Sequence, residues 1–229
     1  MSSSTLLYAI LAGVLPSFIW LAFWLREDID RPEPRSLLAG GFLAGSLSII
    51  VAIFAEKYIS DVVNNENLRY ALWAAAEEMI KFVAVIVVAL RSKWNDEPID
   101  AMIYMITVAL GFAAIENALF ILGPLSNGAI AESIATGGMR FIGATLVHVV
   151  SSALIGFTLG LAFYKGKIVK FIAAIVGLTM AIALHASFNL TIINSHSTDI
   201  LRTFVWVWSA VVILIILFEE VKVVRPKLL

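Results

Sequence analysis

The chain has 229 residues, of which 61% are hydrophobic and 14% are charged, and its net charge at pH 7 is -1. Soluble domains carry about 25% charged residues, so this composition excludes an ordinary soluble protein, and the near-neutral charge argues against a nucleic-acid partner. Cysteine is absent, which excludes disulfides, thiolate metal ligands and a cysteine nucleophile. No polar stretch is long enough to bury a core, so we expect one integral membrane domain over residues 1–229.

Seven apolar stretches follow one another along the chain, and each has the roughly 20 residues that a helix needs to cross a bilayer. They cover residues 6–25, 37–59, 69–90, 101–122, 139–164, 168–193 and 203–221. Polar connectors separate the stretches. The sequence therefore predicts an all-α fold, a polytopic bundle of about seven transmembrane helices.

Basic residues concentrate on alternate connectors, after the first, third, fifth and seventh stretches. They are Arg26, Arg31, Arg35, Arg91, Lys93, Lys165, Lys167, Lys170, Lys222, Arg225 and Lys227. Connectors rich in lysine and arginine stay in the cytoplasm, so we expect the N-terminus outside and the C-terminus in the cytoplasm. This orientation requires an odd number of crossings, which seven satisfies.

The third stretch contains two adjacent carboxylates, Glu77 and Glu78, followed one turn later by Lys81. An ionised side chain in hydrocarbon is costly unless it meets a partner or a wet cavity. Lys81 has the spacing to pair with one glutamate and leave the other free. Adjacent residues point about 100° apart on a helix, so the two carboxylates need not share a role. This cluster is therefore the first candidate for a functional site.

Three later stretches carry polar groups at a similar depth. They contribute Glu116 with Asn117, then His148, then His185 with Asn189, and the last two residues share one helix face because they are four positions apart. In the predicted orientation these groups and the paired glutamates lie on the order of 9–14 Å below the outer surface. We expect them to line a polar chamber that opens toward the outside.

Two hydrolytic chemistries and one non-enzymatic function fit these groups. A glutamate can activate water as a general base, while histidine and asparagine donors stabilise the oxyanion of a tetrahedral intermediate. Two histidines and a glutamate also form a ligand set for catalytic zinc, although the chain has no His-Glu-x-x-His motif. A proton-coupled transporter or a sensor would use the same groups as a relay or an ion site, but neither internal repeats nor paired helix breaks are evident.

The motifs resemble the PrsW family of intramembrane proteases, which is related to the CAAX prenyl protease and bacterial ABI group. The resemblance extends over residues 26–190. It rests on the loop 28–34, on Glu77-Glu78-x-x-Lys81, on the segment 96–100 leading into 111–117, on His148, and on His185-Ala-Ser-Phe-Asn189. It implies a single peptidase domain over 1–229, in a multi-pass protein of a bacterial or archaeal cell membrane. The implied reaction is the first cleavage of a membrane-bound anti-sigma factor on the extracytoplasmic side.

The resemblance also implies roles by position. Glu77 is expected to be the base and Glu78 its support, although the reverse assignment fits the same sequence. His148 is expected to assist the water or the oxyanion, and His185 with Asn189 to complete an oxyanion hole.

Three further residues are expected to support the site. Glu116 and Asn117 belong to the family pattern without an assigned role. In the first motif of the CAAX group an arginine stands where this chain has Lys81, which lies one position earlier. This difference argues against prenylated substrates.

Two cofactor states are expected to be possible: no cofactor, or a divalent metal such as zinc. Glu77, His148 and His185 are the candidate ligands for such a metal. The expected partners are a membrane-embedded protein or peptide substrate and the lipid bilayer.

Three other polar features are expected to be structural. Asp100 begins the fourth stretch, where a helix dipole favours a negative charge. The loop 31–35 is expected to be a cytoplasmic turn and anchor. His196 lies in the polar connector 194–198, and we expect it to be solvated.

Overall fold

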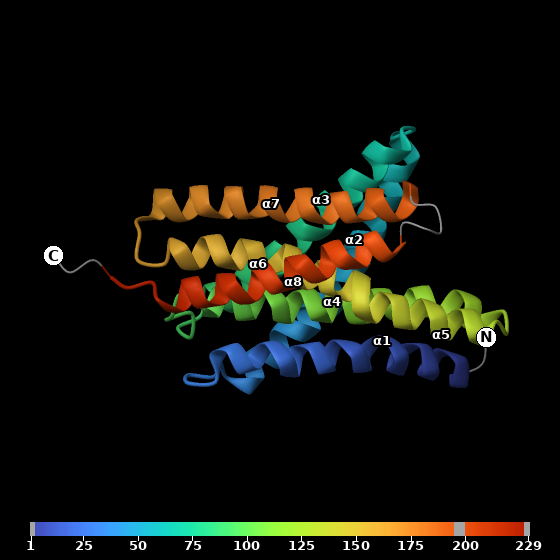
Figure 1. The fold of residues 1–229 in the computed structure, drawn as a ribbon, viewed down its shortest axis with the longest axis horizontal. Helices are drawn as coiled ribbons and strands as arrows, with labels where there is room; N and C mark the ends of the chain where they lie inside the picture. The colour runs from blue at the N-terminus through green and yellow to red at the C-terminus, as the bar shows by residue number, and fades with distance from the viewer. Residues whose placement is uncertain (1–2, 195–199, 227–229) are drawn as a thin grey trace.

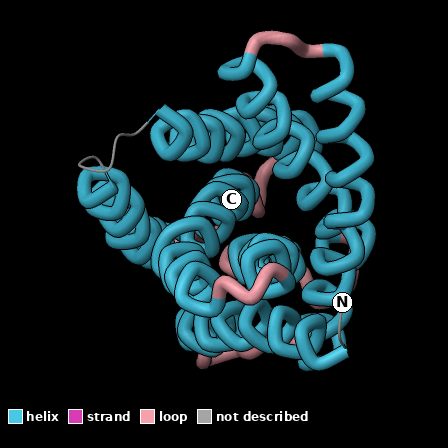
Figure 2. The backbone as a smooth tube through the Cα atoms, turned by 90° about the vertical axis from the view of Figure 1, so that its right-hand side faces the viewer, coloured by secondary structure: helices cyan, strands magenta, loops and turns pink. Residues whose placement is uncertain are grey.

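The computed structural model describes residues 3–194 and 200–226, which form helices joined by short connectors (Figure 1). The helices are α1 (Ser3–Trp24) with the 3-10 turn η1 (Leu25–Asp28), α2 (Arg35–Val62), α3 (Glu66–Val85) with the π-turn η2 (Ile86–Leu90), α4 (Asp100–Ser126), α5 (Ile130–Met139), the π-turn η3 (Arg140–Ala144), α6 (Thr145–Leu161), α7 (Lys167–Asn194) and α8 (Ile200–Lys222). The described residues contain no strand, which confirms the predicted all-α fold (Figure 2). His196 and Lys227 lie outside the described residues.

Most of the helices have the length and composition of membrane spans. Six helical runs qualify among the described residues: Ser3–Asp28, Arg35–Val62, Asp100–Ser126, Ile130–Leu161, Lys167–Ile193 and Leu201–Lys222. The remaining long helix, α3, is more polar because it carries Glu77, Glu78 and Lys81, and all three are buried inside the protein. The chain is therefore a polytopic membrane bundle, and its one polar helix is the one that was predicted to carry the site.

The fifth helix is longer than its apolar stretch predicted. The stretch suggested a start near residue 139, but helix begins at Ile130 and continues through η3 to Leu161. Its first turns contain Glu132, a serine, a threonine and two glycines, which lowers their hydropathy below that of a span. The π-turn η3 lies where the polar and apolar parts meet, and π-turns inside helices are frequent at functional sites.

Helix α4 forms the core of the bundle and packs against α1, α2 and α6. It is apolar on all sides from Met102 to Ala114 and is buried over that length, as expected of a helix surrounded by others. Glycines allow the close approach. A Cβ on Gly111 would lie 2.8 Å from the carbonyl carbon of Phe42, and one on Gly156 would lie 2.5 Å from Met102 Cα. Small residues thus let α2 and α6 pack directly on the α4 backbone.

The bundle has two distinct ends. The start of α1 and the end of α8 lie at opposite ends (Figure 1), as an odd number of crossings requires. We name the end where Arg26, Arg31, Lys222 and Arg225 line a common surface pocket the basic end. That the basic end faces the cytoplasm stays a prediction from the distribution of lysine and arginine.

Candidate active site

Lys81 pairs with one of the two adjacent glutamates, as its spacing predicted. Its Nζ donates to Glu78 Oε1 at 2.6 Å but lies 3.9 Å from Glu77 Oε2. Lys81 and Glu78 are completely buried and Glu77 is 4% exposed. Glu77 Oε2 has no hydrogen-bond partner. One carboxylate on α3 is therefore neutralised by a direct hydrogen-bonded ion pair, and the other keeps an oxygen without a hydrogen bond.

Glu78 is held by three side chains from three helices. Besides Lys81, Ser152 on α6 donates its hydroxyl to Glu78 Oε2 at 2.8 Å, and His185 Nδ1 on α7 lies 2.9 Å from Glu78 Oε1. A carboxylate with this many partners is fixed in position and poorly placed to accept another proton. Glu78 thus has the surroundings of a positioning group.

His148, on α6, lies between the α3 cluster and Glu116. Its Nδ1 is 2.9 Å from Lys81 Nζ and 3.8 Å from Glu77 Oε2, and its Nε2 is 2.8 Å from Glu116 Oε2. A lysine ammonium only donates hydrogen bonds, so His148 Nδ1 must accept and Nε2–H must donate to Glu116. The nitrogen that faces Glu77 therefore carries a lone pair.

His185, on α7, repeats this arrangement. Its Nδ1 meets Glu78, which as a carboxylate only accepts, so Nδ1–H is the donor. In the neutral ring, Nε2 then carries a lone pair, and it lies 3.9 Å from Glu77 Oε2. The rings of His148 and His185 meet edge to face, with centroids 4.9 Å apart. Both imidazoles thus direct an unprotonated nitrogen toward Glu77.

Arg140 holds the other side of the site. It lies in the π-turn η3, forms a hydrogen-bonded ion pair with Glu116, and donates from Nε to Asn117 Oδ1 at 2.6 Å. The Asn117 amide in turn donates to Thr145 Oγ1 at 2.9 Å. Glu116 is therefore tied to both Arg140 and His148, while Asn117 links α4 to η3 and α6.

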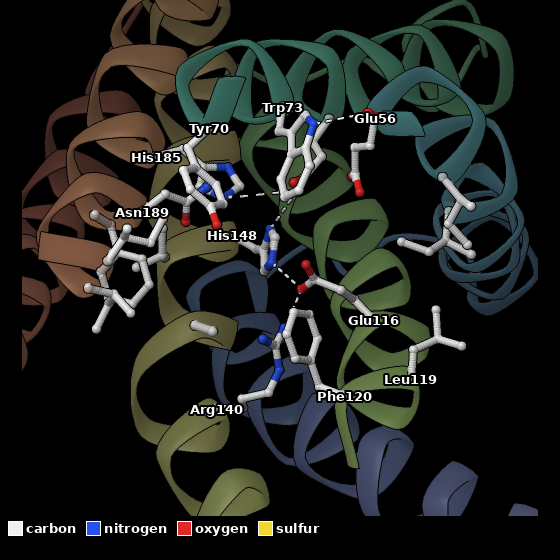
Figure 3. A pocket seen from close by; sticks show the side chains of 18 residues that line it. Glu56, Tyr70, Trp73, Glu116, Leu119, Phe120, Arg140, His148, His185 and Asn189 are labelled. Atoms are coloured by element: carbon white, nitrogen blue, oxygen red, sulfur yellow. Dashed lines mark hydrogen bonds and ion pairs between the residues drawn. The ribbon is translucent and has the colours of Figure 1, made fainter. Parts of the chain in front are cut away.

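A cavity of about 440 Å³ opens beside these groups. In Figure 3, His148 lies at its centre, between Glu116 with Arg140 and the side chains of α3. Asn189, one helical turn after His185, lines the cavity as predicted. Other lining residues are Ile49, Ile53, Glu56, Tyr70, Trp73, Leu119, Phe120, Val147, Phe188 and Ile192. The mostly apolar wall and the few polar groups are typical of a ligand site, here with room for a short stretch of peptide.

The predicted residues therefore meet, and several others join them. Five of them line the cavity: Glu77, Glu116, His148, His185 and Asn189. Two more, Lys81 and Glu78, contact the cavity residues His148 and His185. Arg140 and Glu56 were missed, although each is a charge inside a predicted span, a signal that the sequence does carry. Ser152 and Trp73, whose Nε1 donates to the Glu56 carbonyl at 3.1 Å, gave no such signal.

The same geometry fits a metal ion. Glu77, His148 and His185 each place one ligand atom within 4.8 Å of the others. Each histidine donates a hydrogen bond from the N–H of its other ring nitrogen to a carboxylate, His148 to Glu116 and His185 to Glu78, and metal-bound histidines are usually oriented in this way. The unpartnered Glu77 Oε2 supplies the third ligand atom. These residues suit zinc, which binds two histidines and a carboxylate at catalytic sites.

Known proteins are similar to this chain over most of its length. A sequence model of the family described as "PrsW family intramembrane metalloprotease" matches residues 33–218. The protein named Protease PrsW of Geobacillus kaustophilus is 30% identical over 68% of this chain and 67% of its own length. Those of Bacillus subtilis and Clostridioides difficile are 23% and 26% identical, over 86% of this chain and 89% and 84% of theirs.

No solved structure matches the chain. The family match covers well over half of the sequence, and the helices suit a multi-pass protein of the cell membrane. The chain belongs to the PrsW family of intramembrane proteases, and it is a peptide hydrolase.

Proposed function

We propose that this protein cleaves a peptide bond of a membrane-embedded protein in the cavity beside Glu77. The observation that carries the proposal is the surroundings of Glu77 Oε2, which is buried, has no hydrogen-bond partner and lies between two imidazole nitrogens. A buried polar atom without a partner is costly, so this position is expected to hold a ligand in the working protein. A catalytic water or a metal ion with its water meets that need.

The protonation of the histidines favours a metal ion. Because Glu116 and Glu78 each take the N–H of one imidazole, His148 Nδ1 and His185 Nε2 face Glu77 as lone pairs. Three electron-pair donors that converge on one point suit a cation better than they suit a developing oxyanion. We infer that Glu77, His148 and His185 hold a divalent ion such as zinc. When bound, such an ion lowers the pKa of its water to about 7 and polarises the substrate carbonyl.

The remaining polar residues position these groups and the substrate. Glu78 and Glu116 fix the orientation of the two imidazole rings. Lys81 offsets the charge of Glu78 and is held at the site by the ring of Phe112, whose centroid is 4.8 Å from Nζ. The Asn189 amide lies on the cavity wall, where it can donate to the carbonyl oxygen of the bond to be cleaved.

A second version of the mechanism uses no ion, and the position of Lys81 favours it. Its ammonium is already 2.9 Å from His148 Nδ1, so an ion at this nitrogen must displace it toward Glu78. In this version Glu77 accepts a proton from the attacking water and returns it to the nitrogen of the broken C–N bond. His148, His185 and Asn189 stabilise the oxyanion, which requires the imidazoles to be protonated on the nitrogens that face Glu77.

The predicted orientation places the site in the outer half of the membrane. Substrate cleavage is then expected near the outer leaflet, within or just outside a transmembrane segment. An anti-sigma factor anchored by one such segment is the kind of substrate that the family resemblance suggests. The lipid-facing surface of the helices keeps enzyme and substrate in the same bilayer.

The test uses purified protein in lipid vesicles with a single-span anti-sigma factor of the host cell. Glu77→Gln is expected to lower the cleavage rate by about 10²–10⁴-fold, the contribution typical of a positioned acid–base group. The matched control is Glu66→Gln, which changes an exposed glutamate at the start of the same helix and should keep wild-type activity. Cleavage by Glu77→Gln at the wild-type rate, with its fold confirmed by circular dichroism, would contradict the proposal.

A further inference from the structure

A second group of buried carboxylates lies at the basic end of the bundle, away from the cavity. Asp28 ends η1, Glu33 lies in the connector that follows, and Asp100 begins α4. They are 6%, 7% and 1% exposed, and each places one carboxylate oxygen within 4.8 Å of the other two. Asp100 and Glu116 are separated by about 24 Å along α4, so this acid cluster is distinct from the peptidase site.

The acid cluster is only partly satisfied by hydrogen bonds. Asp100 Oδ2 accepts from the backbone N–H groups of Asp96 and Glu97, at 2.7 and 2.6 Å. Tyr104 donates its hydroxyl to Glu33 Oε2. Asp28 Oδ2 is buried and has no hydrogen-bond partner. One oxygen of the cluster, Asp28 Oδ2, thus lacks a hydrogen-bond partner.

Basic side chains lie near the acid cluster, on the pocket that Asp28 also lines, but the ion pairs that they form are with other acids. Among the described residues, none of the ion pairs involves Asp28, Glu33 or Asp100. The basic side chains nearby bind other acids: Lys222 pairs with Glu27 and Glu219, and Arg31 with Glu97. The cluster therefore requires either bound protons or a bound cation.

The ligand chemistry differs from that of the peptidase site. The acid cluster offers only oxygen donors, namely three carboxylates and a tyrosine hydroxyl. Oxygen-only sets bind hard cations such as Mg²⁺ and Ca²⁺, whereas imidazole nitrogens favour zinc. A surface pocket of about 550 Å³ at the basic end is lined by Asp28 and by the basic residues Arg26, Arg31, Lys222 and Arg225, and an ion would enter from the solvent through it.

We propose that Asp28, Glu33 and Asp100 bind one hard divalent cation, Mg²⁺ or Ca²⁺. Such an ion would join three segments: the end of α1 through η1, the connector before α2, and the start of α4. Because α4 is the core helix and carries Glu116, the ion would fix the register of the bundle far from the reaction. Its role is structural, so cation binding is expected to raise stability without being consumed or displaced during cleavage.

The test measures cation binding by the full-length protein in detergent, after dialysis against buffer freed of divalent ions on a chelating resin. Isothermal titration with MgCl₂ and with CaCl₂ should show saturable binding of one ion to the wild type. Asp28→Asn and Glu33→Gln should each weaken this binding about tenfold or more, since ion affinity follows the number of charged ligands. Asp30→Asn, which changes an exposed acid in the same connector, should bind as the wild type does.

Thermal unfolding supplies a second readout that a purely structural carboxylate would not give. Without divalent ions, Asp28→Asn should unfold at a higher temperature than the wild type, because it replaces a buried acid that has no ion-pair partner with a neutral amide. With Mg²⁺ or Ca²⁺ the order should reverse. Absence of saturable binding to the wild type at millimolar Mg²⁺ and Ca²⁺ would overturn the proposal and leave shared protons as the source of neutrality. Binding that Asp28→Asn and Glu33→Gln leave intact would overturn it as well.

Discussion

The protein buries two groups of carboxylates, and their surroundings give them different chemistry. At the peptidase site, Glu77 faces two imidazoles while its neighbour Glu78 is bound by Lys81, Ser152 and His185. In the acid cluster at the basic end, carboxylates face carboxylates and no imidazole is present among the three members. The comparison teaches that the partners of a buried acid decide which ligand suits it: we propose zinc where imidazole nitrogens surround the carboxylate, and a hard structural cation where only oxygen donors do.

The strongest way to separate the two groups is to remove a histidine. His185→Ala deletes a ligand and the partner of Glu78, so cleavage is expected to fall by about 100-fold or more, with loss of bound zinc. Mg²⁺ and Ca²⁺ titrations of this variant should match those of the wild type. Ser187→Ala, an exposed position on the same helix, is the control. Loss of Mg²⁺ binding in His185→Ala would show that the two sites are not independent.

Lys81 tests how far the peptidase site depends on an internal cation. Lys81→Met leaves Glu78 charged and buried without its ion-pair partner, which is expected to lower the free energy of unfolding by about 3–5 kcal/mol. The measurement is denaturant unfolding in detergent without added metal. Lys57→Met, an exposed lysine on α2, should change stability little. A Lys81→Met protein as stable as the wild type would show that Glu78 is neutral in the folded protein.

Glu116 is expected to act on the metal through His148. Glu116→Gln removes the carboxylate that accepts from His148 Nε2, and zinc affinity should fall by about 10–100-fold, as for other residues that orient a metal-bound histidine. Competition with a zinc-binding dye measures the change. Glu132→Gln, an exposed glutamate at the start of α5, is the matched control. Unchanged zinc affinity in Glu116→Gln would assign Glu116 to holding Arg140 alone.

The smallest expected effect concerns pH and the acid cluster. The folded pKa of Glu33 is about 8, above its ordinary value of 4.5, so the folded state binds more protons than the unfolded state between these values. The stability due to this group is therefore present at low pH and is lost as the pH rises toward 8. The groups that face Glu33 are Asp28, Asp100 and the Tyr104 hydroxyl. Thermal unfolding from pH 5 to about pH 8 in ion-free buffer should show this decline, and Glu33→Gln or added Mg²⁺ should reduce it.

Much of the fold and the site was predictable because membrane helices have strong local signals. The length of the apolar stretches predicted the helices. The free-energy cost of a charged side chain in lipid indicated that Glu77, Glu78 and Lys81 must have partners inside the protein. The spacing of Lys81 also predicted that one glutamate would remain free. That His148 and His185 lie close to Glu77 was predicted from the similar depth of the three residues in the membrane.

Other features depend on tertiary packing that a single sequence does not express. The early start of the fifth helix was hidden by polar residues in its first turns, so the inward position of Arg140 was missed. The acid cluster was missed because its members come from three segments near connectors, where charges are ordinarily solvated. Asp100 was expected only as a charge at a helix start. It does accept backbone N–H groups there, but it is also buried beside Asp28 and Glu33, which its sequence position did not indicate.

The central claim, that Glu77, His148 and His185 hold a catalytic metal ion, is tested most directly by cleavage at known zinc content. The wild type would be dialysed against a zinc chelator, its zinc measured by elemental analysis, and its cleavage of the membrane-anchored substrate followed before and after zinc is restored. We expect cleavage to fall in proportion to the zinc removed and to recover on its return. Undiminished cleavage by zinc-free protein, with no other divalent ion bound, would contradict the claim and establish the version in which Glu77 alone activates the water.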